Sequence, residues 1–146
     1  MKFTEKQLRH FAESAAGEKE AASEETHCAD EKNAATDHNY KRMVRIIEKM
    51  RCLMEEQGCA SAREVSFFEL ESLLWNLPNE LFMRHCFYRY LFDDIVEYLY
   101  RNDERMAGYK ELDGVKPLCP QYTDRNRING FIYELRQFYE YCLTED

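Results

Sequence analysis

The sequence is short of the residues that interrupt helices, with five Gly and three Pro among its 146 residues. It has no apolar run of about eighteen residues or more, so we expect no membrane-spanning helix. Its first residues also lack the apolar segment and the small-residue cleavage site of a secretory signal peptide. We therefore expect a cytoplasmic protein with no membrane partner.

Metal-binding patterns are missing as well. None of the six cysteines forms a Cys-x-x-Cys pair, which is a common spacing in zinc and redox sites. His27-Cys28 and His85-Cys86 bring both residue types together, but adjacent side chains on a helix point in different directions. We therefore expect no metal site, and reduced thiols of which many are buried.

Recognisable catalytic motifs are also absent: there is no Gly-rich phosphate loop, no Ser-His-Asp set and no His-Glu-x-x-His. Glu69 and Glu71 lie two positions apart on a predicted helix, about 200° around its axis. Asp93 and Asp94 diverge in a similar way. Because neither pair can direct both carboxylates at one metal ion, we predict no catalytic residue and no cofactor in this chain.

What the sequence does contain is acidic and aromatic, with a net charge of −8, ten Tyr and nine Phe. That charge argues against strong nucleic-acid binding. The charge is uneven, because Lys and Arg outnumber Asp and Glu in residues 39–63, whereas residues 1–38 and 64–146 are acidic. A basic segment in an acidic chain is a candidate contact for an anion.

The N-terminal quarter divides into a helix and a polar stretch. Thr4-Glu5-Lys6-Gln7 is a capping box that begins a short amphipathic helix over about residues 4–16. From Ser14 to His38 almost no large apolar residue occurs, so this stretch cannot bury enough surface to offset its chain entropy. We predict that residues 1–38 comprise a short helix and an acidic flexible linker, and that residues 39–146 form one domain.

The rest of the chain follows the helical spacing of apolar residues. Gly58 suits the position just past a helix end, Ser61 and Ser66 each begin a capping box, and Pro78 ends a helix. The expected helices cover about residues 39–57, 67–76 and 81–100, and a last helix begins after Thr123 or Asp124.

One segment breaks this pattern. Asp113-Gly114 is a tight-turn pair inside a hairpin-like insertion near residues 109–118. No series of strands accompanies it that could make a sheet. The predicted fold class is therefore all-α, an antiparallel helical bundle with one short hairpin-like insertion.

Lys41, Arg45 and Lys49 recur at steps of four, so they form one ridge along the first helix of the predicted domain. Such a ridge can bind phosphate oxygens, and a guanidinium can do so with two hydrogen bonds. The alternative, which spacing alone favours, is the solvated face of an amphipathic helix.

Ser66 and Phe67 form a second candidate site. The hydroxyl and the free backbone amides at a helix start can bind an anion, and the neighbouring aromatic ring can stack a base. The structural alternative is also complete, because Ser66 caps the helix together with Glu69 and Phe67 can belong to the core.

Three segments together resemble a known family. The stretches Asn39–Ile47, Val65–Pro78 and Tyr109–Lys116, followed by the helix after Arg125, resemble the C-terminal half of bacterial nucleotidyltransferases related to cGAS and oligoadenylate synthase. Ser-Phe-Phe-Glu-Leu-Glu-Ser-Leu-Leu-Trp-Asn-Leu-Pro is the most specific of these matches. The resemblance covers roughly residues 30–146.

The resemblance implies a helical half that contacts a nucleoside triphosphate, in bacterial antiviral defence, beside an α/β palm that holds magnesium. This chain has neither the Gly-Ser turn nor the strands of a palm. We therefore expect that the chain alone catalyses no reaction and that magnesium binds only where a palm is present. We also expect weak triphosphate binding at Lys41, Arg45, Lys49, Ser66 and Phe67. Relatives tend to carry Lys where this chain has Glu48, which we expect to repel phosphate.

Three functional hypotheses remain. The chain is the C-terminal part of an oligonucleotide second-messenger synthase, with a catalytic palm as partner. Alternatively, it is a stand-alone helical interaction module that has lost nucleotide binding and contacts an intact relative or another protein. The third hypothesis is an unrelated acidic helical bundle.

Overall fold

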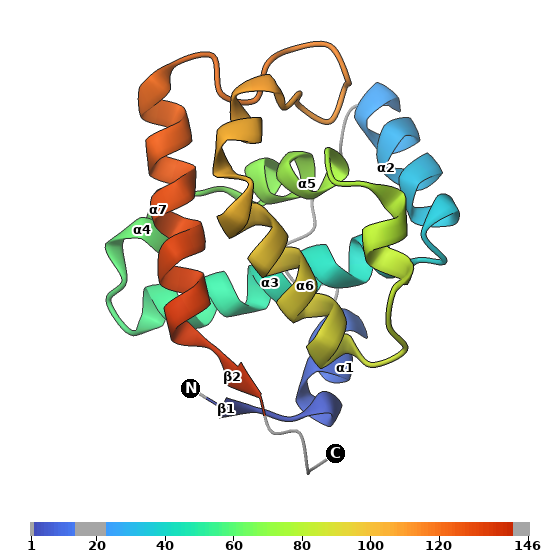
Figure 1. Ribbon diagram of the computed structural model, residues 1–146, viewed down its shortest axis with the longest axis vertical. Helices are drawn as coiled ribbons and strands as arrows, with labels where there is room; N and C mark the ends of the chain where they lie inside the picture. The colour runs from blue at the N-terminus through green and yellow to red at the C-terminus, as the bar shows by residue number, and fades with distance from the viewer. Residues whose placement is uncertain (1, 14–22, 142–146) are drawn as a thin grey trace.

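The computed structural model describes residues 2–13 and 23–141 of the chain. Its described part is helical almost throughout, and this confirms the predicted all-α class (Figure 1). The α-helices are α1 (Glu5–Glu13), α2 (Ser23–Ala35), α3 (Asn39–Glu56), α4 (Ala60–Arg63), α5 (Phe67–Trp75), α6 (Tyr88–Arg101) and α7 (Tyr122–Phe138). Two 3₁₀ helices, η1 (Asn79–Met83) and η2 (Asp103–Gly108), and the two-residue strands β1 (Lys2–Phe3) and β2 (Glu140–Tyr141) complete it.

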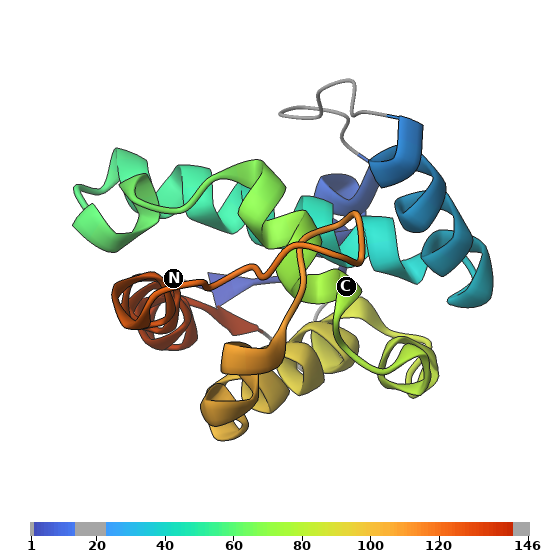
Figure 2. The same cartoon turned by 90° about the horizontal axis from the view of Figure 1, so that it is seen from above.

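The helices form two layers with α5 between them. Seen from above, α2 and α3 lie on one side, α6 and α7 lie on the other, and α5 crosses the middle (Figure 2). The core is continuous across both layers, because apolar residues of every layer are buried in one cluster. It includes Tyr40, Met43, Ile47 and Met50 of α3, Leu70, Leu73 and Leu74 of α5, Phe92 and Ile95 of α6, and Phe131 and Leu135 of α7.

Helix α1 is the short N-terminal helix that the sequence predicts, and Thr4 caps it as expected. The amide of Gln7 donates to Thr4 Oγ1 at 3.2 Å, and the Gln7 side chain accepts from the Thr4 amide at 2.9 Å. The buried carboxylate of Glu5 accepts from the amides of Tyr88 and Arg89, at 2.8 and 3.0 Å, and so caps the start of α6. Strand β1 also pairs with β2 in parallel, so the first residues are packed into the fold.

Helix α2 occupies part of the stretch that composition predicts as a flexible linker. Residues 14–22 of that stretch lie outside the described part, but residues 23–35 are helical. Contacts with distant residues order this helix: buried Lys32 donates through Nζ to the Leu77 carbonyl at 2.6 Å and to Asn79 Oδ1 at 2.7 Å. Composition cannot reveal such contacts, so the prediction of a linker over 23–35 is wrong.

The predicted helix over residues 81–100 is two elements. Helix η1 ends at Met83, and α6 begins only at Tyr88. The apolar pattern continues from η1 into α6 because both elements bury side chains in the same core. Helix η1 contributes Leu81 and Phe82. The break lies where Glu5 caps α6, a contact between residues 83 positions apart.

Two turn predictions are confirmed. Helix α3 ends just before Gly58, whose φ of +86° is the left-handed conformation that Gly adopts without strain. In the insertion, Lys110 and Pro117 form an antiparallel bridge, and Asp113 Oδ1 accepts from the amide of Val115 at 2.9 Å. Of the two predicted serine capping boxes, however, Ser66 caps α5, whereas α4 begins after Cys59 without a side-chain cap.

Candidate nucleotide-contacting surface

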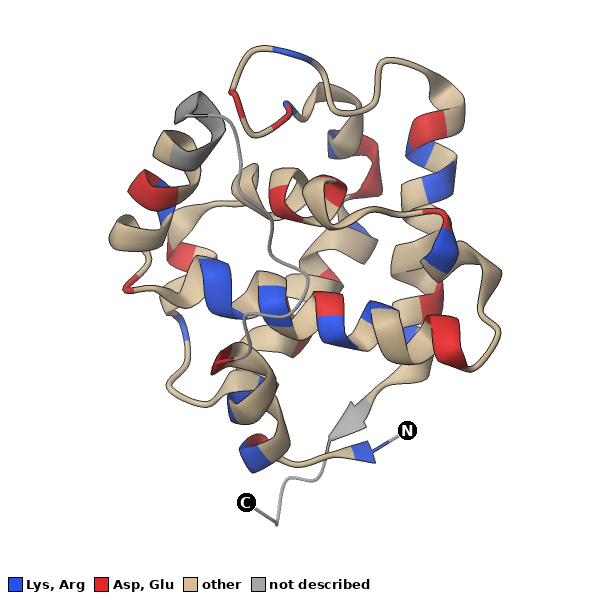
Figure 3. Ribbon diagram, turned by 180° about the vertical axis from the view of Figure 1, so that it is seen from behind, with Lys and Arg blue, Asp and Glu red and all other residues tan. Residues whose placement is uncertain are grey.

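The three predicted cations lie on one face of α3. Seen from behind, Lys and Arg positions recur along the helix that crosses the middle of the view (Figure 3). Lys41 is half-buried, and its Nζ forms an ion pair with Asp30 Oδ1 of α2 at 2.6 Å. Lys49 is exposed, and its Nζ lies 5.8 Å from the ring centroid of Phe11 of α1.

Arg45 lies between these two cations and contacts the end of α1. Its guanidinium donates through Nη1 to the Ala12 carbonyl at 3.1 Å. A cation near the last carbonyls of a helix also interacts favourably with the helix dipole. The ridge of Lys41, Arg45 and Lys49 therefore exists as predicted, and it contributes contacts to α1 and α2 as well as positive charge.

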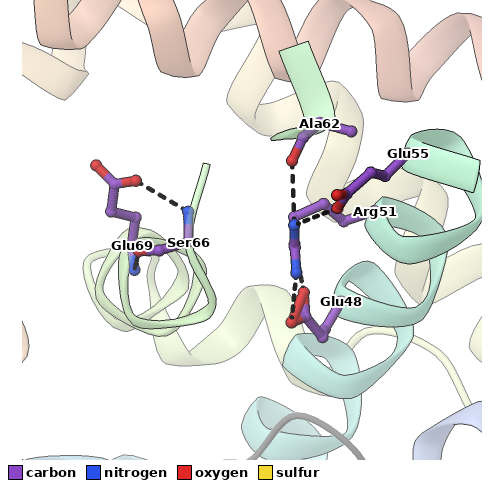
Figure 4. A network of polar contacts seen from close by, with 6 residues as sticks. All are labelled: Glu48, Arg51, Glu55, Ala62, Ser66 and Glu69. Carbon is purple, nitrogen blue, oxygen red and sulfur yellow. Dashed lines mark hydrogen bonds and ion pairs between the residues drawn. The ribbon is translucent and has the colours of Figure 1, made fainter. Parts of the chain in front are cut away.

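Glu48 differs from its expected role. The side chain is buried, with 6% of it exposed, and both of its carboxylate oxygens accept from Arg51 of the same helix, at 2.5 and 3.1 Å (Figure 4). Arg51 also donates to the Ala62 carbonyl at 3.1 Å and thereby ties α3 to α4. The Glu48 carboxylate is therefore paired inside the fold and is not a free charge beside the ridge.

The hydrogen bonds that Arg51 donates to Glu48 raise the pKa of the Arg51 guanidinium. The helical spacing of three positions could have suggested the pair, since residues three apart share a face. Sequence spacing does not, however, tell whether such a pair is buried or exposed.

Ser66 lies at the start of α5, close to this network (Figure 4). Its hydroxyl accepts from the Glu69 amide at 3.1 Å, and Glu69 Oε1 accepts from the Ser66 amide at 3.0 Å. Ser66 is exposed, so its hydroxyl faces solvent while it caps the helix. The cap therefore satisfies two of the donors that would otherwise be available for an anion.

Arg127 of α7 is a residue that sequence reasoning missed. It forms two hydrogen bonds to Glu69, of 2.9 and 2.6 Å, and a third to the Glu64 carbonyl at 2.6 Å. Burial alone raises the pKa of Glu69, but the hydrogen bonds from Arg127 and Ser66 outweigh it and the net shift is downward. The start of α5 is thus held to α7 by an ionised pair between residues 58 positions apart.

Phe67, the predicted stacking residue, is half-buried and packs against the core. Its backbone belongs to the first turn of α5, next to Ser66, as the sequence predicts. The remaining exposed part of the ring is the only part that a base can contact.

Among the residues that the structure describes, no group of three His, Cys, Asp or Glu side chains could hold a metal ion. Among the same residues, no helix is both long and apolar enough to span a bilayer.

Comparison with known proteins places the fold in a family. Residues 27–140 match the cGAS/DncV-like nucleotidyltransferase C-terminal helical domain. The chain is 28% identical over 110 residues to the cyclic GMP-AMP synthase CdnE03 of Staphylococcus schleiferi, covering 75% of this chain and 34% of that protein. It is 30% identical over 87 residues to the cyclic dipyrimidine nucleotide synthase CdnE of Cecembia lonarensis, covering 60% of this chain and 30% of the relative.

Among solved structures, the chain resembles the Elizabethkingia meningoseptica CdnE cyclic dinucleotide synthase with GTP and Apcpp. The TM-score is 0.70 at 25% identity, over 79% of this chain and 43% of that one. The chain spans about a third of the length of the curated relatives that it matches. The matched residues include α3, α5, α6 and α7, so the chain belongs to the cGAS/DncV-like nucleotidyltransferase C-terminal helical domain family.

Proposed function

We propose that this chain supplies the helical lid that contacts the nucleoside triphosphate in an oligonucleotide second-messenger synthase, and that it is not catalytic alone. The observation that carries this proposal is the shared fold with a synthase whose structure was determined with GTP and Apcpp. The proposed contacts are Arg45 and Lys49 for phosphate, with Lys41 beside them, and Ser66 and Phe67 for the base and its neighbouring oxygens. A role in antiviral defence belongs to the same proposal.

The chemistry of these residues supports phosphate contact without supporting reaction. Lys49 is exposed, and Glu48 is paired with Arg51, so the Glu48 carboxylate opposes a triphosphate beside the ridge less than an unpaired acid would. Weak binding is expected, on the order of millimolar or about 4 kcal/mol, because Lys41 is already paired with Asp30. Exposed charges are screened by salt, so the affinity falls as ionic strength rises.

Magnesium does not fit the described residues. A catalytic pair of ions needs converging carboxylates, and in the described part Glu69 is bound to Arg127, while Asp94 accepts from His85 at 2.9 Å. No catalytic step is therefore assigned to this chain, and magnesium enters only with a partner that supplies the palm.

Calorimetric titration of the chain with ATP and with inorganic tripolyphosphate tests the proposal. Lys49→Ala is expected to weaken both ligands a few-fold, whereas Lys116→Ala, which removes an equal charge from the exposed hairpin, leaves them unchanged. If Phe67 stacks the base, ATP binds more tightly than tripolyphosphate, and Phe67→Leu abolishes that difference. Equal losses in the Lys49→Ala and Lys116→Ala variants would contradict the proposal, because they would show only a general charge effect.

One observation favours the alternative, a stand-alone interaction module that has lost nucleotide binding. All three cations of the ridge make contacts within the fold, with Asp30, the Ala12 carbonyl and the Phe11 ring. Absence of triphosphate binding at low salt, together with retained binding to an intact relative or to a separately encoded palm, would support this alternative over the lid.

A further inference from the structure

The C-terminal ends of α3 and α7 meet at a pocket of about 510 Å³, which we call the α3–α7 pocket. Its lining comes from the last turns of these two helices, the turn after α3 and the first residues of α4, at the left of Figure 1. The volume lies within the roughly 300–1,000 Å³ of sites that enclose small molecules. Lys41, Arg45 and Lys49 do not line it, so the pocket is separate from the cationic ridge.

Part of the lining is apolar. Phe138 of α7 and Cys59, just before α4, are half-buried and pack against the core, and Met54 of α3 is buried beside them. The exposed parts of Phe138 and Cys59 therefore offer apolar surface inside the pocket. A hydrocarbon group that packs there is removed from water, which is favourable.

The polar part of the lining is rich in hydrogen-bond acceptors. Glu134 and Gln137 of α7 and Gln57, which follows α3, are exposed. Ser61 is half-buried, and its Oγ lies 3.3 Å from Cys59 Sγ. A carboxylate only accepts hydrogen bonds, and Gln and Ser side chains also carry an acceptor oxygen. An ammonium group has three N–H donors and no acceptor, so it matches this lining.

The two helix ends add negative potential at the same place. Helix α3 has 18 residues and α7 has 17, and the C-terminal end of a helix carries the equivalent of about half a negative charge. The last turn of α3, which is described in full, contains no basic residue and includes Glu56. Arg136 in the last turn of α7 is directed to α6, where its Nε donates to Glu97 Oε1 at 2.6 Å. The pocket therefore favours a positively charged ligand.

From these features we propose that the α3–α7 pocket binds a small aliphatic amine. The ammonium group lies at the two helix ends and donates to Glu134 and the neighbouring amide oxygens, while the alkyl stem packs on Phe138 and Cys59. A divalent metal ion is a poorer match, because it needs several oxygen ligands with more charge than the one carboxylate in the described lining supplies. The site does not depend on the proposed triphosphate contact.

An NMR titration of the full chain with pentylamine and with 1-pentanol tests the charge requirement. The two probes share one alkyl stem, but 1-pentanol is neutral. Pentylamine is expected to shift the backbone amide signals of Gly58 and Ser61 and to bind about fivefold more tightly than 1-pentanol, because it gains charge-assisted hydrogen bonds and the helix dipoles. Equal affinities of the two probes would overturn the proposal.

Two pairs of variants locate the site, and circular dichroism verifies that each variant is folded. Glu134→Gln is expected to weaken pentylamine binding about threefold, whereas Glu104→Gln, which removes the same charge from exposed η2, leaves it unchanged. Ala60→Trp adds bulk to the pocket lining at an exposed position and is expected to abolish binding. Ala107→Trp is the matched control, since Ala107 is exposed and lines a different pocket.

The same variants can contradict the assignment. Equal losses in Glu134→Gln and Glu104→Gln would show only a general attraction of the amine to an acidic protein. Binding at the wild-type level in a folded Ala60→Trp variant would place the amine outside the pocket. Lys49→Ala, which tests the triphosphate contact, is expected to leave pentylamine binding unchanged, so the two proposals succeed or fail separately.

Discussion

The Glu48 carboxylate is the clearest case, at the scale of single residues, of a charge whose effect depends on its partner. Glu48→Lys places a second cation inside the fold beside half-buried Arg51, which then keeps only Glu55, at 3.4 Å, as a counter-charge. We expect it to lower the free energy of unfolding by about 3 kcal/mol or more, as measured by urea denaturation. Glu56→Lys, an exposed position on the same helix, is the control and is expected to change stability little. An unaltered midpoint in the Glu48 variant would contradict the buried pair.

Lys32 gives a prediction on pH at the same scale. Burial lowers the pKa of its ammonium group to about 8 from an ordinary value of 10.5. Between these values the unfolded chain holds this proton more firmly than the folded chain, so unfolding becomes harder as pH rises through that window. The free energy of unfolding of the wild type, minus that of Lys32→Met, is therefore expected to increase from below pH 8 to about pH 10. A flat difference would show that the ammonium group is not desolvated.

At the scale of elements, the first turn of α5 is capped by a side chain, whereas the first turn of α4 has no side-chain cap. Ser66→Ala removes the oxygen that accepts from the Glu69 amide and is expected to cost about 1 kcal/mol of stability. Ser61→Ala is the matched control, since Ser61 lies within α4 and caps no helix; its hydroxyl lies 3.3 Å from Cys59 Sγ. Equal losses from the two changes, measured by thermal unfolding, would contradict the assigned roles.

The elements also show where periodicity suffices and where it fails. Helices α3, α5 and α7 follow from apolar spacing because each buries one face in the core. Helix α2 does not, since its buried Lys32 is held by the carbonyl of Leu77, which lies far along the chain. The break between η1 and α6 is hidden for the same reason, because Glu5 supplies the cap from another element.

At the scale of the whole molecule, we predict that the chain alone makes no cyclic or linear oligonucleotide. The described residues bring no set of carboxylates together for divalent ions, so neither an attacking hydroxyl nor a leaving pyrophosphate can be activated by them. Incubation with labelled ATP, GTP, CTP and UTP and either magnesium or manganese checks this, with an intact synthase as positive control. Product that depends on this chain and copurifies with it would contradict the prediction.

The sequence by itself determined the fold class, the ridge of Lys41, Arg45 and Lys49, the cap at Ser66 and the turn at Asp113-Gly114. These features depend on residues within a few positions of one another, whose spacing along a helix or turn sets their relative placement. They do not depend on which helices are neighbours.

Only the tertiary structure decided which charges face solvent and which are paired. It placed Glu48 against Arg51 inside the fold, joined Glu69 to Arg127 across two helices, and ordered α2 through Lys32. The physical reason is that burial sets the strength of an ion pair or hydrogen bond, and burial depends on the packing of elements that are distant in sequence.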